Sequence, residues 1–171
     1  NPIAGKDSRF KAGNILFCGR HINTIWIVDR KTDQVVWAWG PEILKGPHMP
    51  TMLPNGHILV YDNGKWTQEN PRGYTQIIEI NPLTNEIVWT YKAEPPEEFY
   101  SPSRGSNELL PNGNVLIAES DSGHLFEVTR DGKVVWNFYN PDIRENGQRD
   151  ALYRTIPYSY ELVNKLLSMW K

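Results

Sequence analysis

Three stretches of the chain share one pattern of apolar and polar positions. They read IWIVDRKTDQVVWAW at 25–39, IIEINPLTNEIVWTY at 77–91 and LFEVTRDGKVVWNFY at 125–139. Each combines a run of β-branched and other apolar residues, a polar turn, and a second run that contains a Val-Trp pair, at Trp37, Trp89 and Trp136. Two apolar runs separated by a short turn of Asp, Asn, Thr or Gly are typical of a β-hairpin.

A second phrase precedes each of these hairpins. LPNGHILVYDNG at 53–64 returns as LPNGNVLIAESDSG at 110–123, and a weaker form, KAGNILFCG, stands at 11–19. Asn and Gly tolerate positive φ, so the phrase predicts a tight turn between two strands. A unit of four short strands that recurs about every 40 to 50 residues is typical of a β-propeller.

The pattern therefore predicts an all-β protein built from propeller blades. We expect three four-stranded antiparallel blades at about 7–39, 48–91 and 104–139, which form an incomplete ring within residues 1–141. In the tail, residues 142–171, SYELVNKLLSMW at 159–170 spaces its apolar residues as a helix does, with Ser159 as the N-cap. This predicts a short C-terminal helix.

An open set of three blades leaves two blade faces unpaired. We therefore expect another protein chain to complete the propeller, either a second copy or a different subunit. Trp37, Trp89 and Trp136 are expected to occupy equivalent outer-strand positions and to be buried between blades.

Composition excludes several classes of protein. The 171 residues are 39% hydrophobic with a formal net charge of -2, which argues against disorder and against nucleic-acid binding. No apolar run approaches the length of a transmembrane segment, and NPIAGKDSRF at the start lacks the basic and apolar regions of a signal peptide. Cys18 is the only cysteine, which excludes an intrachain disulfide and a Cys-based zinc site.

Candidate chemistry lies where the repeats differ. His48, in GPHMPTML, and Arg104, in SPSRGSNELL, hold nearly equivalent places before the repeated turn, so we expect them to face one cavity. An imidazole beside a guanidinium suits the binding or transfer of an anionic oxyacid group. Asn63 opens the inserted loop of the second blade, and Arg20 and His21 lie in a loop of the first that can reach the same rim. We expect these three residues to bind the substrate, with a solvated loop position as the alternative for His21.

The repeated phrases carry a family resemblance. The run from GNILFCGRHINT through GPHMPTMLPNGHILVYDNG, followed by RGYTQIIEINPLTNEIVWTY and SPSRGSNELLPNGNVLIAESDSG, is similar to the arylsulfotransferase family of bacterial β-propellers. The resemblance implies a six-bladed, periplasmic or otherwise extracytoplasmic enzyme that moves a sulfuryl group from an aryl sulfate to a phenol through a histidine. No nucleotide donor or cofactor is implied.

Individual residues match the family's active site to different degrees. The histidine before the Pro-Asn-Gly turn matches His48, which would attack the sulfur, and the arginine after Asp-Asn-Gly matches Arg72. Arg72 and Arg104 would then hold the sulfuryl oxygens. The third blade departs from the family pattern, because Arg104, Gly105 and Ser106 stand where another histidine is expected.

Two other functions remain open at this stage. A non-catalytic propeller that binds a partner protein or an anionic ligand is consistent with the missing histidine, and a quinoprotein-like oxidoreductase is suggested by the Val-Trp pairs, although vicinal cysteines are absent. Glu119, Asp121 and His124 lack the spacing of a calcium loop, so we interpret them as a polar turn and predict no metal. His57, in the hairpin turn, is expected to be exposed.

Overall fold

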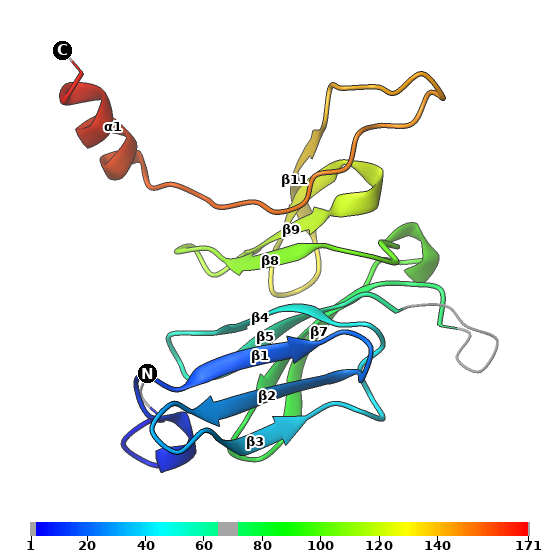
Figure 1. Ribbon diagram of the computed structural model, residues 1–171. Helices are drawn as coiled ribbons and strands as arrows, with labels where there is room; N and C mark the ends of the chain where they lie inside the picture. The colour runs from blue at the N-terminus through cyan, green and yellow to red at the C-terminus, as the bar shows by residue number, and fades with distance from the viewer. Residues whose placement is uncertain (1–2, 65–71, 171) are drawn as a thin grey trace.

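The computed structural model describes residues 3–64 and 72–170. Three antiparallel sheets, each a blade, follow one another along the chain (Figure 1). The strands are β1 (Ile15–Gly19), β2 (Thr24–Asp29) and β3 (Gln34–Trp39) in blade 1; β4 (His48–Met52), β5 (Ile58–Asp62), β6 (Gln76–Asn81) and β7 (Glu86–Tyr91) in blade 2; and β8 (Ser106–Leu109), β9 (Val115–Glu119), β10 (His124–Val128) and β11 (Val134–Tyr139) in blade 3. The predicted all-β propeller fold is confirmed.

The outer hairpins of the three blades share one register. Trp37 pairs with Ile27, Trp89 with Glu79 and Trp136 with Glu127. A β-bulge follows in each hairpin, directly after the residue opposite the tryptophan. The three tryptophans therefore occupy equivalent positions, as their repeat in the sequence predicts.

Blade 1 differs from the prediction at its inner edge. A four-stranded blade over about 7–39 requires its first strand near residue 7, but this segment contains the 3-10 helix η1 (Ser8–Phe10) instead. The Asp7 carboxylate accepts a hydrogen bond from the backbone N–H of Arg9 and so caps this turn, while the Phe10 ring packs edge-on against Trp37 at 5.9 Å between centroids. Capping and burial of one aromatic ring hold the segment out of the sheet, and blade 1 has three strands.

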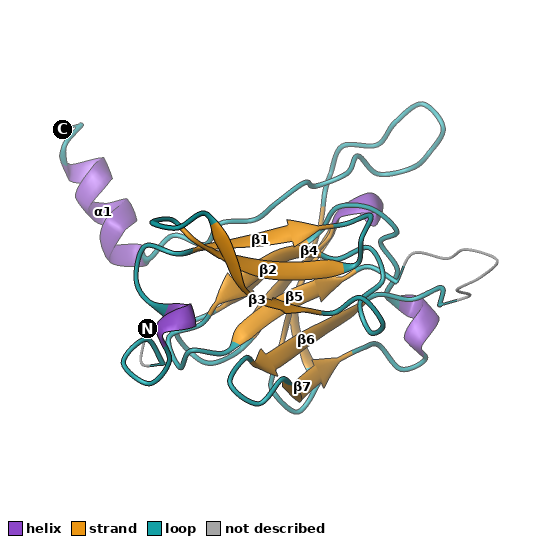
Figure 2. Ribbon diagram, turned by 60° about the horizontal axis from the view of Figure 1, so that its bottom comes forward, coloured by secondary structure: helices purple, strands orange, loops and turns teal. Residues whose placement is uncertain are grey.

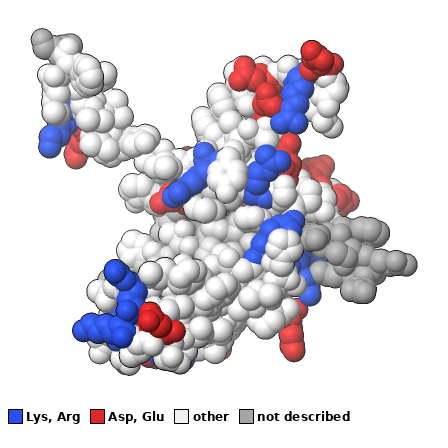
Figure 3. All heavy atoms as spheres, viewed as in Figure 1, with Lys and Arg blue, Asp and Glu red and all other residues white. Residues whose placement is uncertain are grey.

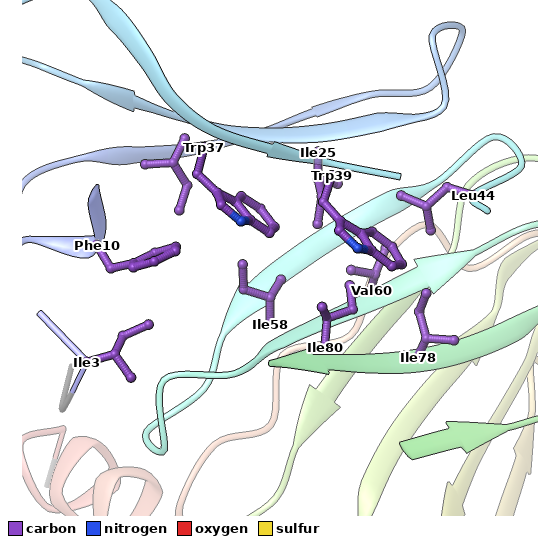
Figure 4. Packing of buried hydrophobic residues seen from close by; sticks show 11 residues of the cluster. Ile3, Phe10, Ile25, Trp37, Trp39, Leu44, Ile58, Val60, Ile78 and Ile80 are labelled. Atoms are coloured by element: carbon purple, nitrogen blue, oxygen red, sulfur yellow. The ribbon is translucent and has the colours of Figure 1, made fainter. Parts of the chain in front are cut away.

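Apolar side chains fill the space between successive blades. Trp37 and Trp39 of blade 1 point toward Ile58 and Ile80 of blade 2 (Figure 4). A second cluster joins blade 2 to blade 3, where Phe99 contacts the rings of Tyr61, Tyr91 and Phe126 at centroid distances of 5.3 to 5.9 Å. Successive side chains of a strand point to opposite faces of the sheet. One face of blade 2 therefore packs against blade 1 and the other against blade 3.

The three tryptophans are buried to different degrees. Trp37 is 5% exposed between blades 1 and 2, and Trp89 is half-buried between blades 2 and 3. Trp136 is 45% exposed, so the prediction that all three are buried between blades is wrong for this residue. Trp136 lies on the outward face of blade 3, where none of the blades formed by the described residues packs against it.

The tail leaves the sheets after β11. The predicted C-terminal helix is present as α1 (Tyr160–Ser168), and the Ser159 hydroxyl accepts a hydrogen bond from the backbone N–H of Leu162 as its N-cap. Every residue of α1 is exposed, and the helix stands apart from the blades in both ribbon views (Figures 1 and 2). Of the helices in residues 3–64 and 72–170, none is long and apolar enough to span a membrane.

Candidate functional site

The candidate residues gather at one end of the blades. His48 is the first residue of β4, and the loops that follow β5, β7 and β9 reach the same end. A bulge between His48 and Thr51, with Met49 at a φ of 46°, shifts the register so that His48 lies opposite Tyr61. This shift brings the His48 imidazole next to the residues that follow β5.

Asn63 is the direct partner of His48. Its side chain is fully buried, and its Oδ1 lies 2.7 Å from Nδ1 of His48. The Nδ2 group of the same amide donates to the backbone carbonyls of Ser101, at 2.7 Å, and Arg104. Because carbonyls only accept, these two bonds fix the orientation of the amide, and Oδ1 must accept a hydrogen bond from the Nδ1–H group of His48. The neutral His48 ring is therefore protonated on Nδ1 and carries its lone pair on Nε2.

A compact loop holds the Arg104 backbone in place for this contact. Asp121 accepts hydrogen bonds from the Ser101 hydroxyl and from the Ser103 backbone N–H, each at 3.0 Å. Arg104 adopts a φ of 61°, and Gly105 follows at 117°. A Cβ at Gly105 would lie 2.3 Å from the buried ring of Tyr61, so only glycine allows the loop to approach blade 2 this closely.

The Arg104 guanidinium lies near the surface. Its Nη2 is 3.1 Å from the Asp121 carboxylate, and the side chain is 44% exposed. An ion pair this exposed contributes at most about 1 kcal/mol, so an incoming anion can compete for the guanidinium. His48 and Arg104 are thus brought together through Asn63, although it is the Arg104 backbone, not its charge, that makes the contact.

Arg72 is held more tightly. Its Nη1 lies 2.8 Å from the Asp62 carboxylate, which is fully buried, and the Arg72 side chain is only 14% exposed. Asp62 also accepts from the backbone N–H of Lys45 at 2.7 Å and from the Gln76 amide at 3.0 Å. The charge of Arg72 therefore neutralises a buried carboxylate. Its role in this structure is to stabilise the fold.

The two remaining candidates lie in the turn between β1 and β2. The Arg20 side chain reaches the loop that precedes β8 of blade 3, where its Nη2 donates to the Pro102 carbonyl at 3.2 Å. His21 is exposed, and within the described part of the chain no hydrogen bond joins it to the other candidates. Arg20 therefore belongs to the same end of the molecule as Arg104, whereas His21 remains a rim residue.

The only thiol near the site is unreactive at neutral pH. Cys18 Sγ donates to the carbonyl of Pro47, the residue before His48, at 3.2 Å. Burial, together with the nearby charge of Asp62, raises the pKa of the thiol to about 11. Cys18 is therefore a poor nucleophile at neutral pH.

Sequence reasoning missed two carboxylates of the site. In the sequence, Asp62 belongs to the repeated turn phrase, and Asp121 has the features of a turn residue. A signal for the first exists, because β5 and β9 both end in an acidic residue, Asp62 and Glu119. The pairing of Asp121 with Arg104 joins two separate loops and has no such signal.

The other histidines are structural. His57 is half-buried and its Nδ1 lies 2.6 Å from the Glu79 carboxylate, so the expectation that it is exposed is wrong. His124 Nδ1 lies 3.0 Å from Glu119, and its ring stacks on Tyr139.

Among the described residues, no group of three or more His, Cys, Asp or Glu is placed to hold a metal ion. The charged side chains visible in Figure 3 form scattered groups of both signs.

A comparison with protein families identifies the family of the chain. The family model described as Arylsulfotransferase (ASST) matches residues 1–141. The chain belongs to the arylsulfotransferase family. The match covers all three blades and stops before the tail that leads to α1. No curated protein matches the chain significantly.

Solved structures that align with this arylsulfotransferase-family chain at TM-scores above 0.5 are β-propeller-like. A streptogramin B lyase aligns with a TM-score of 0.54 and 14% identity over 76% of this chain, and virginiamycin B lyase from Staphylococcus aureus with 0.51 and 16% over 76%. A protein of unknown function from Bacteroides caccae aligns at 0.42 and 15% over 78%. The chain spans 38%, 39% and 62% of these proteins respectively. At such identities the likeness concerns the fold alone.

Proposed function

We propose that this protein transfers a sulfuryl group from an aryl sulfate to a phenolic acceptor, with His48 as the nucleophile. The observation that carries the proposal is the contact between His48 and Asn63, 2.7 Å long, in which the buried amide keeps the proton on Nδ1. The lone pair on Nε2 is then available to attack sulfur without a separate base.

The reaction has two balanced steps. In the first, Nε2 of His48 bonds to the sulfur while the bond between sulfur and the aryl oxygen breaks, and the phenolate leaves with its electron pair. In the second, the oxygen of an acceptor phenol bonds to the sulfur, the nitrogen-sulfur bond breaks, and the phenol proton passes to solvent. The Asn63 oxygen stabilises the positive charge of the sulfated ring through the proton on Nδ1.

The arginines play different parts in this proposal. Arg104 can leave its exposed partner Asp121 and bind the sulfuryl oxygens. Arg20 contacts the same loop through the Pro102 carbonyl. Arg72 supports the site by neutralising Asp62, next to Asn63 in the chain. Sulfuryl transfer passes through a charge-spread transition state, so well-placed cations contribute more than strong acid-base catalysis. Family membership also leads us to propose that the protein acts outside the cytoplasm.

A second candidate function uses the same residues without chemistry. Arg104, Arg20 and His48 could bind a sulfate or carboxylate ligand, and the substitution of Arg104-Gly105-Ser106 for an expected histidine favours this reading. The two functions differ in turnover, not in binding.

The experiment incubates the purified chain with a chromogenic aryl sulfate and a phenol, and measures both the released phenol and the sulfated acceptor. We expect both products with the wild-type chain and neither with His48→Ala. His57→Asn is the matched control, because this histidine lies at the opposite end of the same β4–β5 hairpin and Asn114 fills its place in blade 3. Saturable binding of the aryl sulfate with no product would support the ligand-binding function instead.

A further inference from the structure

The contact between blades 2 and 3 is fastened by three side chains. Trp89 donates from Nε1 to the Arg130 carbonyl at 2.8 Å, and the Arg130 guanidinium lies 4.1 Å from the centre of the Trp89 ring. The same guanidinium is 2.5 Å from Oε2 of Glu79, whose side chain is 5% exposed. We call this arrangement the interblade latch. Glu79 and Trp89 come from blade 2, and Arg130 from the outer turn of blade 3.

The outward face of blade 3 carries the first half of another latch. Glu127 lies opposite Trp136 as Glu79 lies opposite Trp89. Oε1 of Glu127 accepts from the amides of Asn112 and Asn114, at 3.0 and 2.6 Å. Oε1 of Glu79 is held by Asn55 and His57 in the same way. In the described residues Oε2 of Glu127 has no hydrogen-bond or ion-pair partner, and this is the oxygen that binds arginine on Glu79.

Blade 1 carries the second half on its opposite, uncovered side. Arg30 lies in the outer turn, two residues after Val28, as Arg130 lies two residues after Val128. Its side chain is exposed and, within the part of the chain that the structure describes, makes no hydrogen bond or ion pair. Among the described residues, the chain therefore displays one unpaired carboxylate oxygen of Glu127 beside the open Trp136 at one end, and an unpaired Arg30 guanidinium at the other.

The apolar residues around these groups match as well. Blade 3 turns four residues toward blade 2, in the pairs Val115 with Val128 and Ile117 with Phe126, all at most 3% exposed. Blade 1 has apolar pairs at the equivalent positions of its uncovered side. They are Ile15 with Val28 and Phe17 with Trp26, with Ile15 42% and Phe17 40% exposed. The uncovered side of blade 1 thus has the same kinds of residues as the side of blade 3 that packs against blade 2 at the interblade latch.

We propose that blade 1 of a second copy of this chain covers the outward face of blade 3, with Arg30 of that copy bound to Glu127 and Trp136. The charge complementarity and the matching apolar pairs select a copy of the chain as the occupant, because both halves are present on one molecule. The contact is head-to-tail, so each copy retains one free half until a ring closes.

The test measures the mass of the 171-residue chain by sedimentation across a range of concentrations. We expect association into multiples of the 19.7 kDa chain. Glu127→Arg and Arg30→Glu each place like charges across the contact, and each should raise the dissociation constant roughly tenfold or more. An equimolar mixture of the two variants should associate like the wild type, since one kind of junction then has its charges exchanged and the other is unaltered.

Two controls and three outcomes make the test decisive. Lys31→Glu, one residue from Arg30, and Glu145→Arg, in the tail, change charge equally but lie outside the latch and should leave association unchanged. A wild-type chain that stays monomeric overturns the proposal. Equal weakening by the controls, or a mixture that does not regain association, overturns it too. Circular dichroism of each variant establishes that the blades are folded.

Discussion

Truncation of Trp37 to alanine should destabilise the chain far more than the same truncation at Trp136. Trp37 is 5% exposed between blades 1 and 2 and packs against the Phe10 ring. Replacement of a buried tryptophan by alanine costs about 3–5 kcal/mol through lost burial and the cavity left behind. Its Nε1 also donates to Asn85 Oδ1 at 3.1 Å. Asn85 is exposed and water can replace this donor, so the lost bond adds at most about 1 kcal/mol.

The equivalent residue in blade 3 supplies the control. Trp136 is 45% exposed, and its truncation should cost less than about 1 kcal/mol when measured at a low chain concentration that disfavours association. Urea unfolding followed by far-UV circular dichroism gives both free energies of unfolding. A cost near 4 kcal/mol for Trp37→Ala corresponds to a fall in melting temperature of about 8–16 °C. Equal costs at the two positions would refute the inference that blade packing, rather than the hairpin itself, stabilises these tryptophans.

Further predictions concern the arginines and the thiol. Arg72→Ala leaves the buried Asp62 carboxylate unpaired and should cost about 3–5 kcal/mol in unfolding free energy, whereas Arg104→Ala should cost under about 1 kcal/mol yet lower the rate of sulfuryl transfer. The reverse order in urea unfolding would show that Arg72 is the dispensable charge. Cys18, with its pKa raised from 9.0 to about 11, should react with iodoacetamide at pH 8 about a hundredfold more slowly in the folded chain than in urea, with the rate rising as pH approaches 11. Equal rates in the two states would contradict the burial of this thiol.

The fold was largely predictable because each blade repeats a local pattern. The Val-Trp hairpins and the Asn-Gly turns depend on neighbouring residues, and the structure has Trp37, Trp89 and Trp136 in one register. The exposure of Trp136 was not predictable in the same way, because the burial of a blade residue depends on the next blade. The missing first strand of blade 1 reflects the capping of η1 by Asp7, a competing local hydrogen bond.

The site was predictable only in part. The position of His48 follows from the repeat, but a regular hairpin would pair it with Asp62, and the bulge at Met49 pairs it with Tyr61 instead. The pairings of Arg104 with Asp121 and of Arg20 with Pro102 join loops from different blades. Such contacts depend on how the blades pack, which the residue types alone do not specify.

The most direct test of the account is the capture of sulfated His48. The chain is mixed with an aryl sulfate without acceptor, quenched rapidly under alkaline conditions that preserve a nitrogen-sulfur bond, digested and mapped by mass spectrometry. We expect a burst of released phenol matched by one sulfuryl group on the peptide that contains His48, and loss of both in His48→Asn. Phenol release that persists in His48→Asn, or a sulfuryl group on another residue, would contradict it.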